Sequence, residues 1–132
     1  TLARLCPHGP IAYVQCTGAA DSHYQQLQLM EEELREMRTA QGNPFCLLPL
    51  PMAEPAFDQE GNRLPATYAN FLFINGAILM PTYGTPDTDS EAIRRMQVAF
   101  PEYEIIGINC RSLIIQHGSL HCCTMQFPLF TS

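Results

Sequence analysis

The spacing of apolar residues predicts that the first third of the chain forms a strand followed by an amphipathic helix. Residues 11–16 (IAYVQC) are a short apolar run rich in β-forming residues, which is typical of a strand. Ser22 and Gln25 form a capping-box pattern that marks the start of a helix, and Gly42 suits the position just beyond its end. One helix face is predicted to be buried, because apolar residues recur on it at helical spacing: Leu27, Met30, Leu34 and Met37.

A tight hairpin is the clearest local signal in the sequence. Two β-rich runs, 68–74 and 77–83, are separated only by Asn75-Gly76. This dipeptide favours a type I′ turn, in which both central residues have positive φ. The sequence therefore predicts a tight antiparallel hairpin.

A second helix and two more strands are predicted around this hairpin. Thr88 and Glu91 form another capping box, and Pro101 ends the apolar stripe that follows them. Residues 45–50 and 104–108 have the composition of strands. A long proline-rich loop separates the first of these strands from the hairpin, and loops of this kind are often functional.

The two halves of the chain have the same predicted order of elements, which indicates a repeated ββαβ unit and an α/β fold class. The two units span 1–50 and 66–110, and a closing strand is predicted over 119–127. Sheets of such units keep open edges until further copies cover them. The chain also starts without an initiator Met. We therefore expect residues 1–132 to be a single segment of a larger catalytic domain.

The stretch 111–127 (RSLIIQHGSLHCCTMQF) holds the candidate chemistry. An apolar run is followed by a break at 116–119, after which a strand-like pattern carries His121, Cys122 and Cys123. A thiol that follows a glycine break at the start of a strand is accessible to substrate. The alternative is a buried strand whose cysteines act as small apolar fillers.

The net charge of the chain limits which classes of molecule it is expected to bind. The formal net charge is −6, from 7 basic and 13 acidic side chains, which argues against a nucleic-acid or anionic-membrane surface. An acidic protein is compatible with a cationic substrate. No apolar run approaches the length of a transmembrane helix.

The cysteine pattern predicts reduced thiols in a cytoplasmic protein. The six cysteines are scattered and include no C-x-x-C pair, so neither a structural zinc site nor a thioredoxin motif is predicted. Adjacent residues on a strand point to opposite faces, so Cys122 and Cys123 are badly placed to share a metal ion. We expect no metal and no cofactor.

Several motifs resemble one enzyme family. Residues 68–71 (YANF), 74–77 (INGA) and 81–84 (PTYG) resemble the hairpin of the bacterial agmatine deiminases, which belong with the Porphyromonas-type peptidylarginine deiminases. Residues 107–110 and 118–126 are similar to later parts of the same family. The start, 1–5 (TLARL), is similar to the segment that follows the family's His-x-Asp catalytic pair. The resemblance covers essentially the whole chain in the family's order.

The resemblance implies the C-terminal part of a pentein, which is an α/β propeller of ββαβ units. The implied reaction is hydrolysis of a guanidinium group: agmatine to N-carbamoylputrescine and ammonia, as in putrescine and polyamine synthesis, or peptidyl-arginine to citrulline. The thiol of the family's Gly-x-x-His-Cys run is the nucleophile, which corresponds to Cys122 and leaves Cys123 as a core-facing neighbour. Alternatives are an amidinotransferase, another pentein enzyme, or a pentein binding module without catalysis.

The approach to the nucleophile departs from the family pattern. The usual glycine-rich run is here 116–122 (QHGSLHC). His117, Gly118 and Ser119 are therefore candidate substrate-binding residues that narrow the pocket or contact the substrate tail. His121 is expected to make a structural hydrogen bond, and Arg4 a structural ion pair.

The chemistry of a guanidinium group explains what else such a site needs. Its delocalised cation is poorly electrophilic, so carboxylates must hold its N–H groups in pairs while a thiolate attacks. The resemblance puts the catalytic His and these acids before Thr1. We therefore expect the N-terminal remainder of the same protein to be a partner, and the 132-residue chain alone to be inactive. A homo-oligomer is left open.

Overall fold

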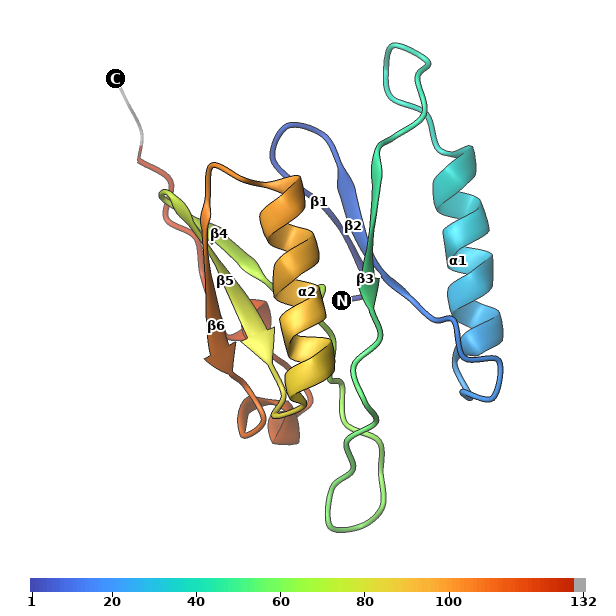
Figure 1. Ribbon diagram of the computed structural model, residues 1–132, viewed down its shortest axis with the longest axis vertical. Helices are drawn as coiled ribbons and strands as arrows, with labels where there is room; N and C mark the ends of the chain where they lie inside the picture. The colour runs from blue at the N-terminus through green and yellow to red at the C-terminus, as the bar shows by residue number, and fades with distance from the viewer. Residues whose placement is uncertain (130–132) are drawn as a thin grey trace.

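The computed structural model describes residues 1–129, which form two three-stranded sheets with one helix each (Figure 1). The first sheet has the order β1-β2-β3, with β1 (Ala3–Leu5) antiparallel to β2 (Ile11–Gln15). The chain then passes through α1 (Tyr24–Glu36) and returns as β3 (Leu47–Pro51), parallel to β2. A parallel pair needs a crossover of this length, and the helix provides it.

The second sheet repeats this connectivity. β4 (Leu72–Ile74) and β5 (Ala77–Thr82) form an antiparallel hairpin. The helix α2 (Pro86–Ala99) then leads to β6 (Glu104–Asn109), which runs parallel to β5. The mixed α/β fold and the repeated order of elements predicted from the sequence are therefore present.

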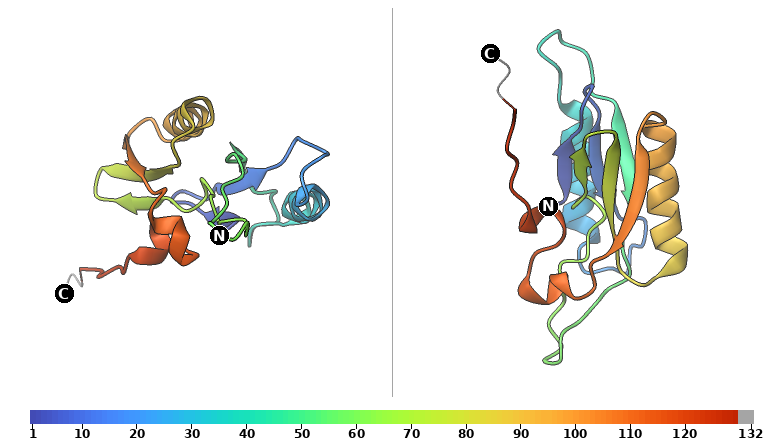
Figure 2. Two further views of the ribbon diagram at one scale, coloured as in Figure 1. Left: turned by 90° about the horizontal axis from the view of Figure 1, so that it is seen from below. Right: turned by 90° about the vertical axis from the view of Figure 1, so that its left-hand side faces the viewer.

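Helix α2 joins the two units. It packs against β6 of its own sheet and against β3 of the other. In Figure 1 it is seen between β5 and β3, and Figure 2 shows it on one outer side of the sheets. Arg95 of α2 donates a hydrogen bond of 3.0 Å to the carbonyl oxygen of Pro49 in β3. Buried residues from both sheets form one continuous core, which includes Val14, Leu50 and Met80.

The predicted closing strand over 119–127 is wrong. After β6 the chain forms two 3₁₀ turns, Leu113–Gln116 and His121–Cys123, and continues without a strand through residue 129. Asn70 Oδ1 accepts the backbone N–H groups of His121 and Cys122 over 2.7 and 3.2 Å. In a strand these donors would bond to a neighbouring strand, whereas here a side chain satisfies them.

Both predicted capping boxes are also wrong. Helix α1 has His23 as its N-cap residue and no side-chain cap, and the Asp21 carboxylate accepts the His23 N–H. It ends at Glu36, well before Gly42, which instead occupies a separate turn with φ of 83°.

Helix α2 begins at Pro86, so Thr88 lies inside its first turn and is not its cap. Asp89 stabilises this start from within the helix, since its carboxylate accepts the N–H groups of Tyr83 and Thr85 at 3.0 Å each.

The hairpin is confirmed, with two differences. Ile74 and Ala77 are paired across the turn as expected. Gly76 has φ of 78° but Asn75 does not have a positive φ, so the turn is not type I′. The segment 68–71 precedes β4 as an irregular, buried stretch, and this stretch carries Asn70. In the part of the chain that is described, no helix is long and apolar enough to cross a membrane.

Candidate active site

Cys122 and Asn70 form the centre of the candidate site. Cys122 lies in the second 3₁₀ turn with its thiol exposed to solvent. The side-chain amide of Asn70 donates a hydrogen bond of 3.2 Å to Cys122 Sγ. Asn70 is itself buried, at 2% exposure, in the stretch that leads into β4. A rigidly held amide therefore presents a donor to an accessible thiol.

The surroundings of Cys122 favour its thiolate. The hydrogen bond from Asn70, followed by the backbone of Ser119, lowers the pKa of the Cys122 thiol against the opposing effect of burial. A hydrogen bond to the charged form always acts in this direction. Because the thiolate is the nucleophile, a lowered pKa increases the reactive fraction at neutral pH.

Arg4 of β1 adds a positive charge to the same region. Its guanidinium lies 4.5 Å from the centre of the Phe71 ring and donates to the Phe71 carbonyl oxygen. Burial lowers the pKa of Arg4, while the nearby Cys6 and Cys122 thiols act to raise it. Arg4 forms no ion pair with any residue in the described range 1–129, so the predicted structural ion pair is not found there.

The three predicted substrate-binding residues occupy different environments. His117 is exposed with φ of 66°, and its charge makes a small contribution to lowering the pKa of Asp58, after the larger effect of hydrogen bonds from Asn62. Gly118 lies against the nucleophile, because a Cβ atom built on it would be 3.1 Å from Cys122 Cβ and 3.7 Å from Sγ. Roles of these two residues in substrate binding stay predictions.

The third residue, Ser119, faces the interior. It is completely buried, and its hydroxyl lies 2.8 Å from the Tyr83 hydroxyl. A side chain in this position is occupied within the core, so the prediction that the Ser119 side chain contacts substrate is wrong.

The neighbours of Cys122 also differ from expectation. Cys123 is exposed and its sulfur accepts a hydrogen bond from Gln116, so the predicted core-facing role is wrong. A 3₁₀ turn does not alternate faces as a strand does, which is why Cys122 and Cys123 both reach solvent. The His121 ring makes no hydrogen bond to residues 1–129, in contrast to the prediction, and burial followed by the charge of Arg4 lowers its pKa.

Several acidic side chains of the described segment are used in structural contacts. Asp21 pairs with Arg63 at 3.0 Å, and Asp58 accepts three hydrogen bonds within its own turn. Glu91 pairs with Arg94 and Arg95. Among residues 1–129 no group of three or more His, Cys, Asp and Glu side chains is arranged to hold a metal ion.

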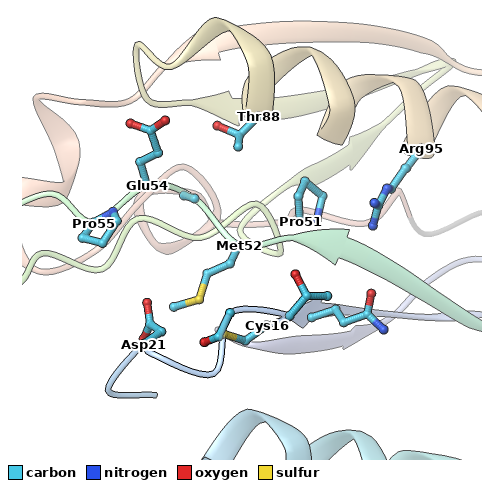
Figure 3. A pocket seen from close by; sticks show the side chains of 12 residues that line it. Cys16, Asp21, Pro51, Met52, Glu54, Pro55, Thr88 and Arg95 are labelled. Atoms are coloured by element: carbon cyan, nitrogen blue, oxygen red, sulfur yellow. The ribbon is translucent and has the colours of Figure 1, made fainter. Parts of the chain in front are cut away.

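A separate cavity of about 380 Å³ lies at the carboxyl ends of β2 and β3 (Figure 3). Thr88 and Arg95 border it from α2, while Cys16 and Asp21 border it from the segment after β2. Its lining does not include Asn70 or Cys122, so this cavity is distinct from the site at the thiol.

Sequence reasoning missed Asn70. It was visible as a polar residue within the quoted 68–71 motif, where three of four residues are apolar or aromatic. No role was assigned to it, because its contact with Cys122 joins positions far apart in the chain.

The sequence of the whole chain identifies the family. A sequence model of the Porphyromonas-type peptidyl-arginine deiminases matches residues 1–128. The chain belongs to this family. The resemblance seen in the hairpin and in the run that contains Cys122 is thereby confirmed.

Members of the deiminase family with solved structures have the same arrangement of elements. A Porphyromonas gingivalis protein, provisionally titled an arginine deiminase, is 54% identical with a TM-score of 0.92 over 97% of this chain and 37% of its own. The C. jejuni agmatine deiminase is 43% identical with a TM-score of 0.82 over 92% of this chain and 36% of its own. A Cys-to-Ser variant of that C. jejuni enzyme, 42% identical with a TM-score of 0.81 over 92% and 34% of the two chains, was solved with substrate bound.

The curated relatives give the same family. A protein of Marinomonas sp. (strain MWYL1), provisionally named an agmatine deiminase, is 33% identical over 91% of this chain and 37% of its own length. The chain therefore spans about a third of the length of the deiminases it matches.

Proposed function

We propose that this chain is the nucleophile-bearing part of an enzyme that hydrolyses a guanidinium group, with Cys122 as the attacking thiol. The hydrogen bond from the Asn70 amide to the exposed Cys122 sulfur carries this proposal. A catalytic thiol needs access to substrate and a donor that favours its thiolate, and Cys122 has both. The C. jejuni relative that holds substrate when a cysteine is replaced by serine supports the same chemistry.

The reaction balances with one water molecule. The Cys122 thiolate attacks the guanidinium carbon and forms a C–S bond, which gives a tetrahedral adduct. One C–N bond then breaks, and the nitrogen leaves as ammonia after a general acid gives it a proton. Water attacks the remaining thiouronium carbon, the C–S bond breaks, and the products are a ureido group and the free thiol.

The Asn70 amide has a defined part in this sequence. It stabilises the thiolate before attack and fixes the direction of the sulfur, because the same side chain also holds the backbone of Cys122. Orientation of this kind lowers the barrier by holding the reacting atoms near their productive geometry. Arg4 lies on the same side and favours the thiolate electrostatically.

The rest of the site is proposed to come from a preceding part of the same protein. The chain accounts for about a third of each relative, and we take its two ββαβ units to be the C-terminal part of a pentein propeller. The preceding part would supply the catalytic His and the carboxylates that bind the guanidinium group. The six free thiols suit the cytoplasm, where we place the protein.

The test is a comparison of the two adjacent cysteines in the complete protein. Ammonia release is measured from agmatine, free arginine and a peptide with C-terminal arginine, and the preferred substrate identifies the activity. Cys122→Ser should abolish release, whereas Cys123→Ser should retain most of it. Equal losses in both variants would refute the assignment of Cys122.

The 132-residue chain by itself should release no ammonia from any of these compounds, because its general acid and substrate-binding carboxylates are supplied elsewhere. Turnover by the chain alone that disappears in Cys122→Ser would show that these groups lie within it.

A further inference from the structure

The hydroxyl of Tyr83 connects the two segments that form the site. Tyr83 Oη donates a hydrogen bond of 2.7 Å to the carbonyl oxygen of Thr67 and lies 2.8 Å from the Ser119 hydroxyl. Thr67 precedes Asn70 by three residues, and Ser119 precedes Cys122 by three residues. The Tyr83 hydroxyl therefore contacts the residue three positions before Asn70 and the residue three positions before Cys122. We call this pair of hydrogen bonds the Tyr83 bridge.

The direction of each hydrogen bond in this bridge is fixed by chemistry. A carbonyl oxygen can only accept, so the single proton of the Tyr83 hydroxyl goes to Thr67, and Ser119 must donate to Tyr83. Burial raises the pKa of Tyr83 to about 12, so this proton is retained at neutral pH. The ring is 1% exposed, and water does not compete for either bond.

Each arm of the bridge leads directly to an atom of the site. The Thr67 carbonyl oxygen also accepts the Asn70 backbone N–H at 3.3 Å, so it forms part of the turn that presents the amide. On the other side, the backbone of Ser119 acts directly on the Cys122 thiol. The Tyr83 hydroxyl thus restrains the segment that carries Asn70 and the segment that carries Cys122, although it contacts neither of these two residues.

We propose that Tyr83 is a positioning residue whose hydroxyl sets the separation between the Asn70 amide and the Cys122 sulfur. This proposal rests on the function proposed above, since it concerns the same thiol. Tyr83 lies just after β5, so its hydroxyl ties both segments to the central strand of the second sheet. Removal of the Tyr83 hydroxyl keeps the packing of the aromatic ring. The segment with Asn70 and the segment with Cys122 can then move apart.

The charged and titratable groups nearest Cys122 lie outside the hydrogen bonds of the Tyr83 hydroxyl. Arg4 on β1 is positive, and His121 is next to Cys122 in the same 3₁₀ turn. Neither of them is hydrogen-bonded to the Tyr83 hydroxyl. A change at the Tyr83 hydroxyl therefore affects the thiol through geometry, with these charges left in place.

The test is Tyr83→Phe in the complete protein. The rate of Cys122 alkylation by iodoacetamide is measured against pH in a Cys123→Ser background, so that the two adjacent thiols are not confused. We expect the alkylation profile to move to higher pH and kcat for the guanidine substrate to fall roughly 10- to 100-fold, with little change in KM. An unchanged profile with unchanged kcat would overturn the proposal.

Tyr68→Phe is the matched control. The Tyr68 ring packs against Tyr83 at 5.5 Å between centroids, but its hydroxyl bonds to Thr88 and Asp89 of α2. This variant should lose thermal stability and keep the alkylation profile of the parent. An equal shift in both variants would show that the effect is a general loss of packing, and would also overturn the proposal.

Ser119→Ala removes the other arm and keeps the proposal testable if Tyr83→Phe folds badly. It should shift the alkylation profile in the same direction, and the double variant should shift it no further than the larger single effect. Additive shifts would mean that the two hydroxyls act independently, contrary to a bridge. Alkylation is independent of turnover, so a failure of the proposed activity, seen as ammonia release that survives Cys122→Ser, is distinguishable from a failure of the bridge.

Discussion

The Asn70 side chain holds Cys122 at two points, since its amide nitrogen donates to the sulfur and its oxygen accepts the N–H of the same residue. A thiol held in this way keeps one direction relative to the backbone, and its thiolate is stabilised by a donor that cannot move away. The contact joins the stretch before β4 to the turn after β6.

Replacement of Asn70 by Ala should raise the pKa of Cys122, because the largest cause of its lowering is removed. The folded-state pKa lies below the unfolded value, so the thiolate stabilises the fold above the unfolded pKa, and this contribution is lost as pH falls through the folded pKa. In Asn70→Ala the pH dependence of stability at alkaline pH should become shallower, and alkylation of Cys122 should move to higher pH. Urea unfolding at several pH values measures the first effect.

Asn75→Ala is the control for this variant, because Asn75 is exposed in the hairpin turn. Its alkylation profile should coincide with that of the parent. A parent-like profile in Asn70→Ala as well would show that the amide does not influence the thiol.

Gly118→Ala should impair catalysis by displacing the nucleophile. The added methyl group would lie 3.1 Å from Cys122 Cβ, which is closer than carbon atoms normally approach. The 3₁₀ turn must then shift, and we expect kcat to fall roughly tenfold or more. Steady-state kinetics with the preferred guanidine substrate provides the measurement.

Gly18→Ala is the matched substitution, since a Cβ at Gly18 meets no atom within 4 Å and the residue lies outside the left-handed region. It should leave kcat unchanged. If both variants were fully active, the close approach of Gly118 to Cys122 would have no catalytic importance.

Asp89→Ala should destabilise the protein by about 2–4 kcal/mol, because the N–H groups of buried Tyr83 and half-buried Thr85 and the Tyr68 hydroxyl would lose their acceptor. Asp87 lies in the same first turn of α2 but is exposed. Asp87→Ala should change the free energy of unfolding by less than about 0.5 kcal/mol. Denaturant unfolding measures the free energy of unfolding of both variants. Equal losses would mean that the hydrogen bonds accepted by Asp89 do not stabilise the protein more than an exposed carboxylate does.

The sequence predicted most of the fold, because strands and helices depend on periodicity that can be read locally. The runs at 11–16, 77–83 and 104–108 all form strands at nearly the expected positions. Helix starts were less predictable, since Ser22 and Thr88 satisfy the capping-box pattern but do not cap, and Asp21 and Asp89 accept the N–H groups of His23, Tyr83 and Thr85. Which carboxylate reaches an N–H group depends on the path of the preceding loop.

The site was predicted only in part. Cys122 was identified by resemblance to a family, and its thiol is accessible as expected. Asn70 was not predicted, because only the folded chain brings it to Cys122. Ser119 was misassigned for a related reason: a polar residue next to a nucleophile suggests contact with substrate, whereas a buried tyrosine partner turns it inward.

The two prolines of β3 have a consequence for how units of this kind assemble. The backbone N–H of Ile11 donates to the carbonyl oxygen of Cys46. In a strand the backbone groups of alternate residues point to the same side, so those of residues 46, 48 and 50 point toward β2. The backbone groups of Pro49 and Pro51 therefore point toward the free edge. Proline has no N–H, so this edge offers few donors to an incoming strand, and the Pro49 carbonyl oxygen is already taken by Arg95. This edge of the first sheet is thereby protected from sheet extension and aggregation, and the second unit meets β3 through the packing of α2.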